Sequence, residues 1–258
     1  MKLFEWLTGR CKKSQEPKPT IVLVHGAFED AGAWSGVTGR LQRCGYRVVA
    51  PPVPLRGVAA DVAYLDSAIK ALDGPVVLAG HSYGGVLVTE LAARNAEKVR
   101  ALVYVAAFIP DAGETVNALN AEFPGSLLGP ETTYTVDHAG GSDMYAKPES
   151  YKQLLADDRS SRAVAVTAAG QRPIDTAALT EQTTAGAPAE IPKFAIVATR
   201  DNAVPTQAQQ HQAERARAEV SRVRASHDVP TSHPAFVARV IKTAIRQSEK
   251  GARGLGDE

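Results

Sequence analysis

The chain has 258 residues, of which 44% are hydrophobic, and this is enough apolar material to bury the core of one large domain without disulfides or metals. Its 29 Lys and Arg residues nearly balance 28 Asp and Glu residues, so the formal net charge of +1 excludes a global field that would hold nucleic acid or an anionic membrane. We therefore expect the partner of the protein to be a neutral small molecule.

The first residues, MKLFEWLTGRCKK, do not resemble a signal peptide, because their apolar stretch is short and is interrupted by Glu5. No window approaches the roughly 18 consecutive apolar residues that span a bilayer. We therefore expect residues 1–19 to be an N-terminal extension of a soluble, cytoplasmic protein. Cys11 and Cys44 lack the ligand spacing of a zinc site and are expected to be free thiols, so the sequence predicts no metal.

After this extension, short β-branched runs alternate with longer helical patterns, which predicts a mostly parallel sheet with helices on both faces. Six strands are expected, over residues 20–26, 46–52, 75–82, 99–107, 193–201 and 219–226. Helices are expected near residues 33–44, 58–72, 83–95, 206–218 and 234–247. Right-handed crossovers would place the loops that follow the strands at one edge of the sheet, where open α/β folds form ligand sites.

Residues 109–191 interrupt this alternation, because they contain no convincing strand and carry Gly/Pro breaks such as FPGSLLGP and YAKPES. They are expected to form a helical cap inserted into a single domain that covers residues 20–258. Such a cap would wall the site and set the shape of the substrate. The candidate wall residues are Phe28, Trp34, Phe108, Tyr134, Met144 and Tyr145.

The most informative segment is PVVLAGHSYGGVLVTELAARN, residues 75–95, in which a strand runs through Gly-His-Ser-Tyr-Gly directly into a helix. This is the G-x-S-x-G motif in the context that a nucleophile elbow requires. Gly80 and Gly84 leave space for a sharp turn that strains Ser82, and the helix N-terminus stabilises negative charge that develops there. We therefore predict that Ser82 is a nucleophile. The alternative is a glycine-rich turn with an incidental serine.

A second segment, VLVHGAFEDAGAW, ends a strand at His25 and continues into a Gly/Ala-rich loop. Acyl transfer needs two aligned N–H donors where the oxyanion forms, and we expect these to be the backbone amides of Ala27 and Tyr83. His25 is expected to be a buried histidine that bonds the loop backbone. His81 is expected to be a packing residue of the elbow whose side chain points away from that of Ser82.

The HGAF segment with its following Trp, the GHSYGG turn with its helix, and the ends of the later strands resemble the small α/β-hydrolases that include plant methylesterases, hydroxynitrile lyases and many bacterial carboxylesterases. The resemblance covers residues 20–247 and is weak in the cap. Its motifs are specific to the superfamily and do not fix a substrate.

A serine hydroxyl attacks only with the help of an imidazole and of a carboxylate that orients this imidazole. In this fold the chain order is serine, acid, histidine. Asp201 follows the strand KFAIVATRD and precedes Pro205, which resembles the acid position of the family. The alternatives are a turn or capping role for Asp201 and an acid at Asp111, where some relatives place it.

Two histidines follow the last strand, in the segment ASHDVPTSHPAF. His233 stands beside Pro234 at the start of the last helix, where the imidazolium that a catalytic histidine must form would oppose the helix dipole. His227 lies in the loop directly after the strand and is therefore predicted to be the base. His138, in the cap, and His211, in a polar helix, are expected to be solvated or structural.

Together these residues favour a serine hydrolase that cleaves a small-molecule carboxylic ester through an acyl-enzyme and needs no cofactor. The alternatives are a hydroxynitrile-lyase-type or perhydrolase-type reaction on the same triad, and a non-enzymatic receptor of the same fold. The resembling lyases carry a lysine after the catalytic histidine and a threonine in the oxyanion loop, whereas this chain has Asp228 and Ala27. The oligomeric state stays open, with a homodimer as one alternative.

Overall fold

The computed structural model describes residues 18–254, so Cys11 and nearly all of the extension expected over residues 1–19 lie outside the described residues. Its centre is a six-stranded sheet in the order β2-β1-β3-β4-β8-β9, and every neighbouring pair of strands is parallel. All six strands predicted from the sequence are present, which confirms the mostly parallel sheet. The strands are β1 (Thr20–Val24), β2 (Val48–Val49), β3 (Val76–His81), β4 (Val99–Val105), β8 (Lys193–Ala198) and β9 (Glu219–Val223).

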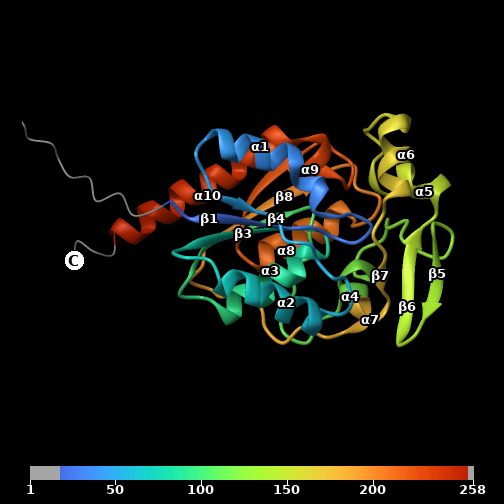
Figure 1. The fold of residues 1–258 in the computed structure, drawn as a ribbon, viewed down its shortest axis with the longest axis horizontal. Coiled ribbons are helices and arrows are strands. Elements are labelled where there is room, and N and C mark those ends of the chain that lie inside the picture. Colours follow the sequence, from blue (N-terminus) through green and yellow to red (C-terminus); the bar gives the residue numbers. More distant parts are fainter. Residues whose placement is uncertain (1–17, 255–258) are drawn as a thin grey trace, which may run out of the picture.

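Helices cover both faces of this sheet, as Figure 1 shows. One face carries η1 (Ala31–Trp34), α1 (Ser35–Arg43), α9 (Val229–Ser232) and α10 (Pro234–Gly254). The other face carries α2 (Val58–Lys70), α3 (Gly84–Arg94) and α8 (Thr206–Arg215). None of the helices within residues 18–254 combines the length and the apolar character that a membrane crossing requires.

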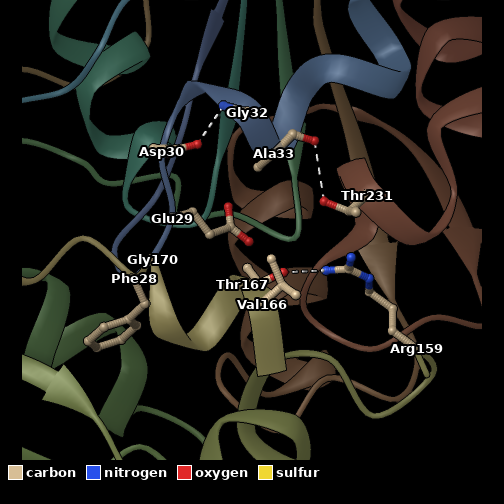
Figure 2. Close-up of a pocket in the computed structure, with 10 residues that line it drawn as sticks. All are labelled: Phe28, Glu29, Asp30, Gly32, Ala33, Arg159, Val166, Thr167, Gly170 and Thr231. Carbon is tan, nitrogen blue, oxygen red and sulfur yellow. Dashed lines mark hydrogen bonds between the residues drawn. The ribbon is translucent and has the colours of Figure 1, made fainter. Parts of the chain in front are cut away.

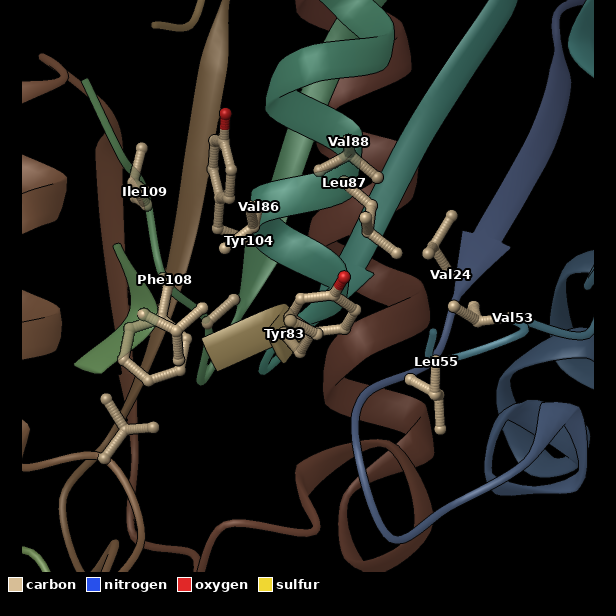
Figure 3. Close-up of a cluster of buried hydrophobic side chains, with 14 of the residues drawn as sticks. Val24, Val53, Leu55, Tyr83, Val86, Leu87, Val88, Tyr104, Phe108 and Ile109 are labelled. Atoms are coloured by element: carbon tan, nitrogen blue, oxygen red, sulfur yellow. The ribbon is translucent and has the colours of Figure 1, made fainter. Parts of the chain in front are cut away.

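The two faces of the sheet produce two hydrophobic clusters, because successive side chains of a strand point to opposite sides. On β1, Val22 and Val24 belong to the cluster under α2, α3 and α8, whereas Ile21 and Leu23 belong to the cluster under α1 and α10. Figure 3 shows part of the first cluster, in which the ring of Tyr83 packs near the start of α3. This burial on both faces explains why the strands read as continuous apolar runs.

The cap segment, residues 109–191, lies between β4 and β8 and sits at one end of the sheet (Figure 1). It contains the expected helices and also a three-stranded antiparallel sheet, so the expectation that this interval holds no strand is wrong. The alternation of Tyr134 and Val136 with polar residues is a strand signal, but it covers only a few residues, and both side chains are exposed instead of facing a core. The cap elements are α4 (Val116–Ala121), β5 (Thr133–His138), β6 (Gly141–Ala146), α5 (Pro148–Leu155), α6 (Ser161–Ala169), β7 (Ile174–Asp175) and α7 (Ala177–Thr180).

Candidate active site

Ser82 lies in the sharp turn between β3 and α3, at the carboxyl edge of the sheet. Its φ angle is 54°, in the left-handed region that a non-glycine residue adopts only under strain. A Cβ atom on Gly80 would collide with the backbone of Gly84, and one on Gly84 would collide with the backbone of Val24. The sequence motif therefore folds locally into the strained elbow that it predicts.

The loop after β1 packs directly against this elbow. A Cβ atom on Gly26 would lie 2.7 Å from Cβ and 3.3 Å from Oγ of Ser82, so only glycine allows this approach. Within residues 18–254, the backbone N–H groups of Ala27 and Tyr83 have no hydrogen-bond acceptor. Two unpaired donors beside a serine hydroxyl are the arrangement that an oxyanion requires.

His25 holds this loop in place. Its Nδ1 atom bonds the carbonyl of Gly26 at 2.9 Å, and its Nε2 atom accepts the backbone N–H of Val53 at 2.9 Å. Burial lowers the pKa of this imidazole, which favours the neutral ring that can accept from Val53. The prediction that His25 is a buried histidine bonding the loop backbone is confirmed.

His227 and Asp201 follow the neighbouring strands β9 and β8, and their side chains meet. His227 Nδ1 lies 2.7 Å from Asp201 Oδ2, and the two side chains are 4% and 0% exposed. The other oxygen of Asp201 accepts the backbone N–H groups of Ala203 and Val204. Because a carboxylate can only accept, Nδ1 carries the proton and Nε2 is left as the basic nitrogen.

Gln209 of α8 is a partner of Asp201 that the sequence analysis did not single out. Its amide nitrogen donates to Asp201 Oδ2 at 2.8 Å and also to the carbonyl of Val204, while its amide oxygen accepts the N–H of Ala198. Gln209 is 2% exposed, but α8 contains four glutamines and also buries Gln212, so the sequence pattern does not single out Gln209. Gln209 therefore holds the same carboxylate oxygen, Oδ2, that faces His227.

The alternative acid, Asp111, has other partners. Its side chain is 64% exposed and lies 3.2 Å from the guanidinium of Arg215. His233, the alternative base, is bonded to Ser232 and has a side chain that is 35% exposed. His211 is also surface-exposed and pairs with Glu122 at 3.2 Å, in agreement with a solvated role.

His81, which directly precedes Ser82, does more than pack. Its Nδ1 atom lies 2.9 Å from Oε2 of Glu29, and both side chains are buried. Burial alone would lower the pKa of His81, but the charge and hydrogen bond of Glu29 outweigh this and raise it to about 9. Burial likewise opposes ionisation of Glu29, and the charge of His81 more than offsets it, so the pKa of Glu29 is lowered. The two residues form a buried ion pair, which sequence reasoning missed because they lie 52 positions apart.

The cap holds both neighbours of His227. Asp158 accepts hydrogen bonds from the backbone and hydroxyl of Ser226, and Arg159 Nη1 lies 2.6 Å from Asp228 Oδ2. The backbone N–H of Asp228 donates to the carbonyl of Leu155 at the end of α5. Burial, followed by repulsion from Glu29, raises the pKa of Asp228 to about 6.

Trp34, which the sequence analysis placed in the substrate wall, is completely buried. It belongs to the cluster under α1 and α10, where its ring packs edge-on against His81 with centroids 6.5 Å apart. The prediction of a wall role is therefore wrong for Trp34, because η1 turns the ring into the core. Phe108 is 3% exposed and packs in the other cluster, with its backbone N–H bonded to the carbonyl of Ser82.

The other candidate wall residues are distributed over the cap and the loop after β1. Tyr134 and Tyr145 are opposite each other on β5 and β6, and their rings stack with centroids 5.3 Å apart. Met144 packs against the first hydrophobic cluster. Phe28 has a φ angle of 62° and lines a cavity of about 240 Å³.

This cavity lies between the loop after β1 and the cap helix α6 (Figure 2). Glu29 and Asp30 line it from one side, and Arg159 and Thr167 from the other. Figure 2 shows the carboxylate of Glu29 directed into the space between them. The lining does not include Ser82, so the cavity adjoins the buried ion pair rather than the nucleophile.

Three side chains of the cap could ligate a metal ion. His138, Asp143 and Asp175 bring one ligand atom each within 4.8 Å of one another. Nη1 of Arg56, however, lies 2.7 Å from Asp143 Oδ1 and 3.4 Å from His138 Nε2. A metal ion would have to displace this guanidinium, so the cluster is an ion-pair network that ties the hairpin to the segment before α2.

Known structures share this fold. A pyrethroid hydrolase from Sphingobium faniae JZ-2 superposes with a TM-score of 0.74 over 88% of this chain and 97% of that one, at 22% sequence identity. At this identity the likeness shows the fold alone.

Curated relatives and a family model extend the comparison to the sequence. A carbendazim hydrolyzing esterase of Nocardioides sp. (strain SG-4G) is 36% identical over 111 residues, which cover 38% of this chain and 46% of the relative. Methylesterase 2 of Arabidopsis thaliana is 28% identical over 152 residues, which cover 51% of this chain and 58% of the relative. The chain thus spans about half the length of these two relatives. The model of the alpha/beta hydrolase family matches residues 21–240, and the chain therefore belongs to the alpha/beta hydrolase family.

Proposed function

We propose that the protein is a serine hydrolase that cleaves a carboxylic ester of a small molecule through an acyl-enzyme. The observation that carries the proposal is the 2.7 Å contact between the buried side chains of His227 and Asp201, at the same sheet edge as the strained Ser82. A buried carboxylate on Nδ1 of an imidazole is the arrangement that makes Nε2 a base for a serine hydroxyl.

In the proposed acylation, Oγ of Ser82 attacks the ester carbonyl and His227 Nε2 takes its proton. The oxyanion is stabilised by the N–H groups of Ala27 and Tyr83, which have no other acceptor within residues 18–254. The tetrahedral intermediate then expels the alkoxide, which receives the proton from His227 and leaves as the alcohol. Asp201 stays ionised throughout and stabilises the imidazolium.

In the proposed deacylation, water attacks the acyl group on Ser82 while His227 again takes a proton. Collapse of the second tetrahedral intermediate releases the carboxylic acid and returns the proton to the serine. The sum is ester plus water giving acid plus alcohol, and it requires no cofactor. Two relatives named as an esterase and a methylesterase support an ester as the substrate class.

A fluorescent organophosphonate probe tests the proposal, because it phosphonylates a serine only where a neighbouring base activates it. We expect the wild-type protein to be labelled at Ser82 and Ser82→Ala to stay unlabelled. His233→Ala serves as a matched control for His227→Ala, since only loss of the proposed base should prevent labelling. A wild-type protein that is folded but unlabelled would instead fit a receptor that binds its ligand without chemistry.

A further inference from the structure

A buried ion pair lies directly behind the proposed catalytic histidine. Glu29 and His81 have side chains that are 4% and 1% exposed, with Oε2 and Nδ1 2.9 Å apart. The ring of His81 is 4.7 Å from the ring of His227, centroid to centroid. A buried ion pair carries a desolvation penalty and stabilises a fold little more than apolar residues of the same size would, so its presence beside the reacting groups calls for a specific role.

The second nitrogen of His81 contacts the backbone of His227. Its Nε2 atom lies 2.9 Å from the carbonyl oxygen of His227. A carboxylate and a carbonyl can only accept hydrogen bonds, so both ring nitrogens of His81 must donate and the ring is an imidazolium. Trp34 packs edge-on against the same ring and confines it.

The peptide unit that joins His227 to Asp228 is therefore held at both ends. Its carbonyl accepts from His81 and from the backbone N–H of Val229 at 2.7 Å, and its N–H donates to the carbonyl of Leu155 at 2.8 Å. The contact of His81 comes from the elbow and that of Leu155 from the cap. A peptide plane held in two directions fixes the direction in which the His227 side chain leaves the backbone.

We propose that Glu29 and His81 are positioning residues: the imidazolium of His81, oriented by Glu29, holds the backbone carbonyl of His227 and so fixes the His227 ring between Asp201 and Ser82. The inference rests on the proposed function, because it assigns a role in the reaction of the same site. His227 is thus held at two points: Asp201 binds its ring, and the pair of Glu29 and His81 binds its backbone.

The hydrogen bond from His81 to the carbonyl of His227 requires the protonated ring, so the proposed positioning depends on pH. The titratable and charged groups that face the pair are His227 and Asp228 from the loop after β9, His25 and Asp30 from the loop after β1, and Tyr151 and Arg159 from the cap. When His81 loses a proton at high pH, the remaining one stays on Nδ1, where the charged acceptor Glu29 forms the stronger hydrogen bond. Nε2 then faces the carbonyl of His227 as a second acceptor, and the contact is lost.

Two double variants separate positioning from packing. Glu29→Gln with His81→Gln keeps an amide N–H near the position of Nε2, whereas Glu29→Gln with His81→Asn, one carbon shorter, places its amide near Nδ1. Both replace the ion pair by neutral hydrogen-bonding groups, so neither leaves a lone buried charge. Thermal unfolding of both variants checks that they are equally folded.

We expect Glu29→Gln/His81→Gln to keep most of the wild-type kcat for a p-nitrophenyl ester, because its amide still donates to the carbonyl of His227. Glu29→Gln/His81→Asn should lose about 10²-fold in kcat with little change in KM, because a base displaced by about 1 Å costs this much. Equal kcat in the two double variants would overturn the positioning role. A wild-type protein without any Ser82-dependent ester turnover would instead overturn the proposed function.

The wild-type protein provides a second test that needs no variant to fold. Its kcat, corrected for spontaneous hydrolysis, should fall as the pH rises through about 9, where His81 titrates. This alkaline limb should be absent in Glu29→Gln/His81→Gln, whose side chains do not titrate. A wild-type kcat that stays constant from pH 8 to pH 10 would contradict the proposal.

Discussion

The Nδ1 atom of His227 lies 2.7 Å from Oδ2 of Asp201, and the Asp201 side chain is fully buried. Three further hydrogen bonds hold the carboxylate, from the backbone of Ala203 and Val204 and from the side chain of Gln209. This makes Asp201 a fixed acceptor that orients the imidazole without having to move during the reaction.

Asp201→Asn should therefore lower kcat for ester hydrolysis by roughly 10⁴-fold, the loss found when the acid of the best-studied triad becomes an amide. The variant keeps the size of the side chain but can stabilise the wrong tautomer of His227. Steady-state kinetics with a p-nitrophenyl ester measures the effect. Asp111→Asn, on the surface beside Arg215, serves as the control and should be close to wild type. Full activity of Asp201→Asn would mean that another residue is the acid of the triad.

His227→Ala should lower kcat by roughly 10⁶-fold, because the members of a triad act as a unit. His233→Ala should have a mild effect, because its ring is bonded to Ser232 and is 35% exposed at the start of α10. The same ester assay on both variants, with circular dichroism to check folding, decides whether His227 or His233 is the base. The assignment of the base is wrong if only the change at His233 stops turnover.

The ion pair of Glu29 and His81 predicts a pH dependence of stability. The pKa of His81 is raised from 6.5 to about 9 in the folded protein, so its contribution is fully present below pH 6.5 and is lost as pH rises through 9. The free energy of unfolding in urea should fall by up to about 3 kcal/mol between pH 6.5 and pH 10. Glu29→Gln/His81→Gln should show a smaller fall over the same range. Equal slopes in the two proteins would mean that His81 is not charged in the fold.

The surroundings of Asp228 predict that the protein does not cleave cyanohydrins efficiently. The residue after His227 is a buried aspartate whose Oδ2 lies 2.6 Å from Arg159, so this arginine is already neutralised. Arg159 is therefore not a free cation for a departing cyanide ion, and Ala27 offers no hydroxyl in the oxyanion loop.

The assay compares mandelonitrile with a short-chain p-nitrophenyl ester at one pH, corrected for spontaneous decay. We expect Ser82-dependent ester cleavage and no Ser82-dependent cyanide release above background. Cyanide release that is faster than ester cleavage and is lost in Ser82→Ala would favour the lyase reaction instead.

The parts of the fold and site that the sequence predicts are those with local signals. Buried strands such as β3 read as apolar runs, and the glycines around Ser82 mark the elbow because no other residue fits there. The approach of Asp201 to His227 also follows from the sequence, since each comes after a strand and parallel neighbours bring such loops together.

The parts that the sequence does not predict depend on long-range contacts. Glu29 lies in a loop whose pattern gives no sign that His81 is its partner, and the burial that makes the pair ionic exists only in the fold. The hairpin of β5 and β6 is hard to predict because the short alternation of Tyr134 and Val136 in β5 lies among Gly/Pro breaks and faces solvent, and β6 is largely polar. The wall role of Trp34 is wrong because a position at the start of a helix does not reveal into which hydrophobic cluster the ring turns.

The most direct test of the proposed hydrolysis is the mass of the peptide that contains Ser82 during turnover. The protein is mixed with p-nitrophenyl acetate, quenched in acid within the first turnovers, digested and analysed by mass spectrometry. An acyl-enzyme at Ser82 predicts a peptide heavier by one acetyl group, a matching initial burst of p-nitrophenol, and neither signal in Ser82→Ala. Turnover that continues unchanged in Ser82→Ala, with the acetyl group on another residue or on none, would contradict it.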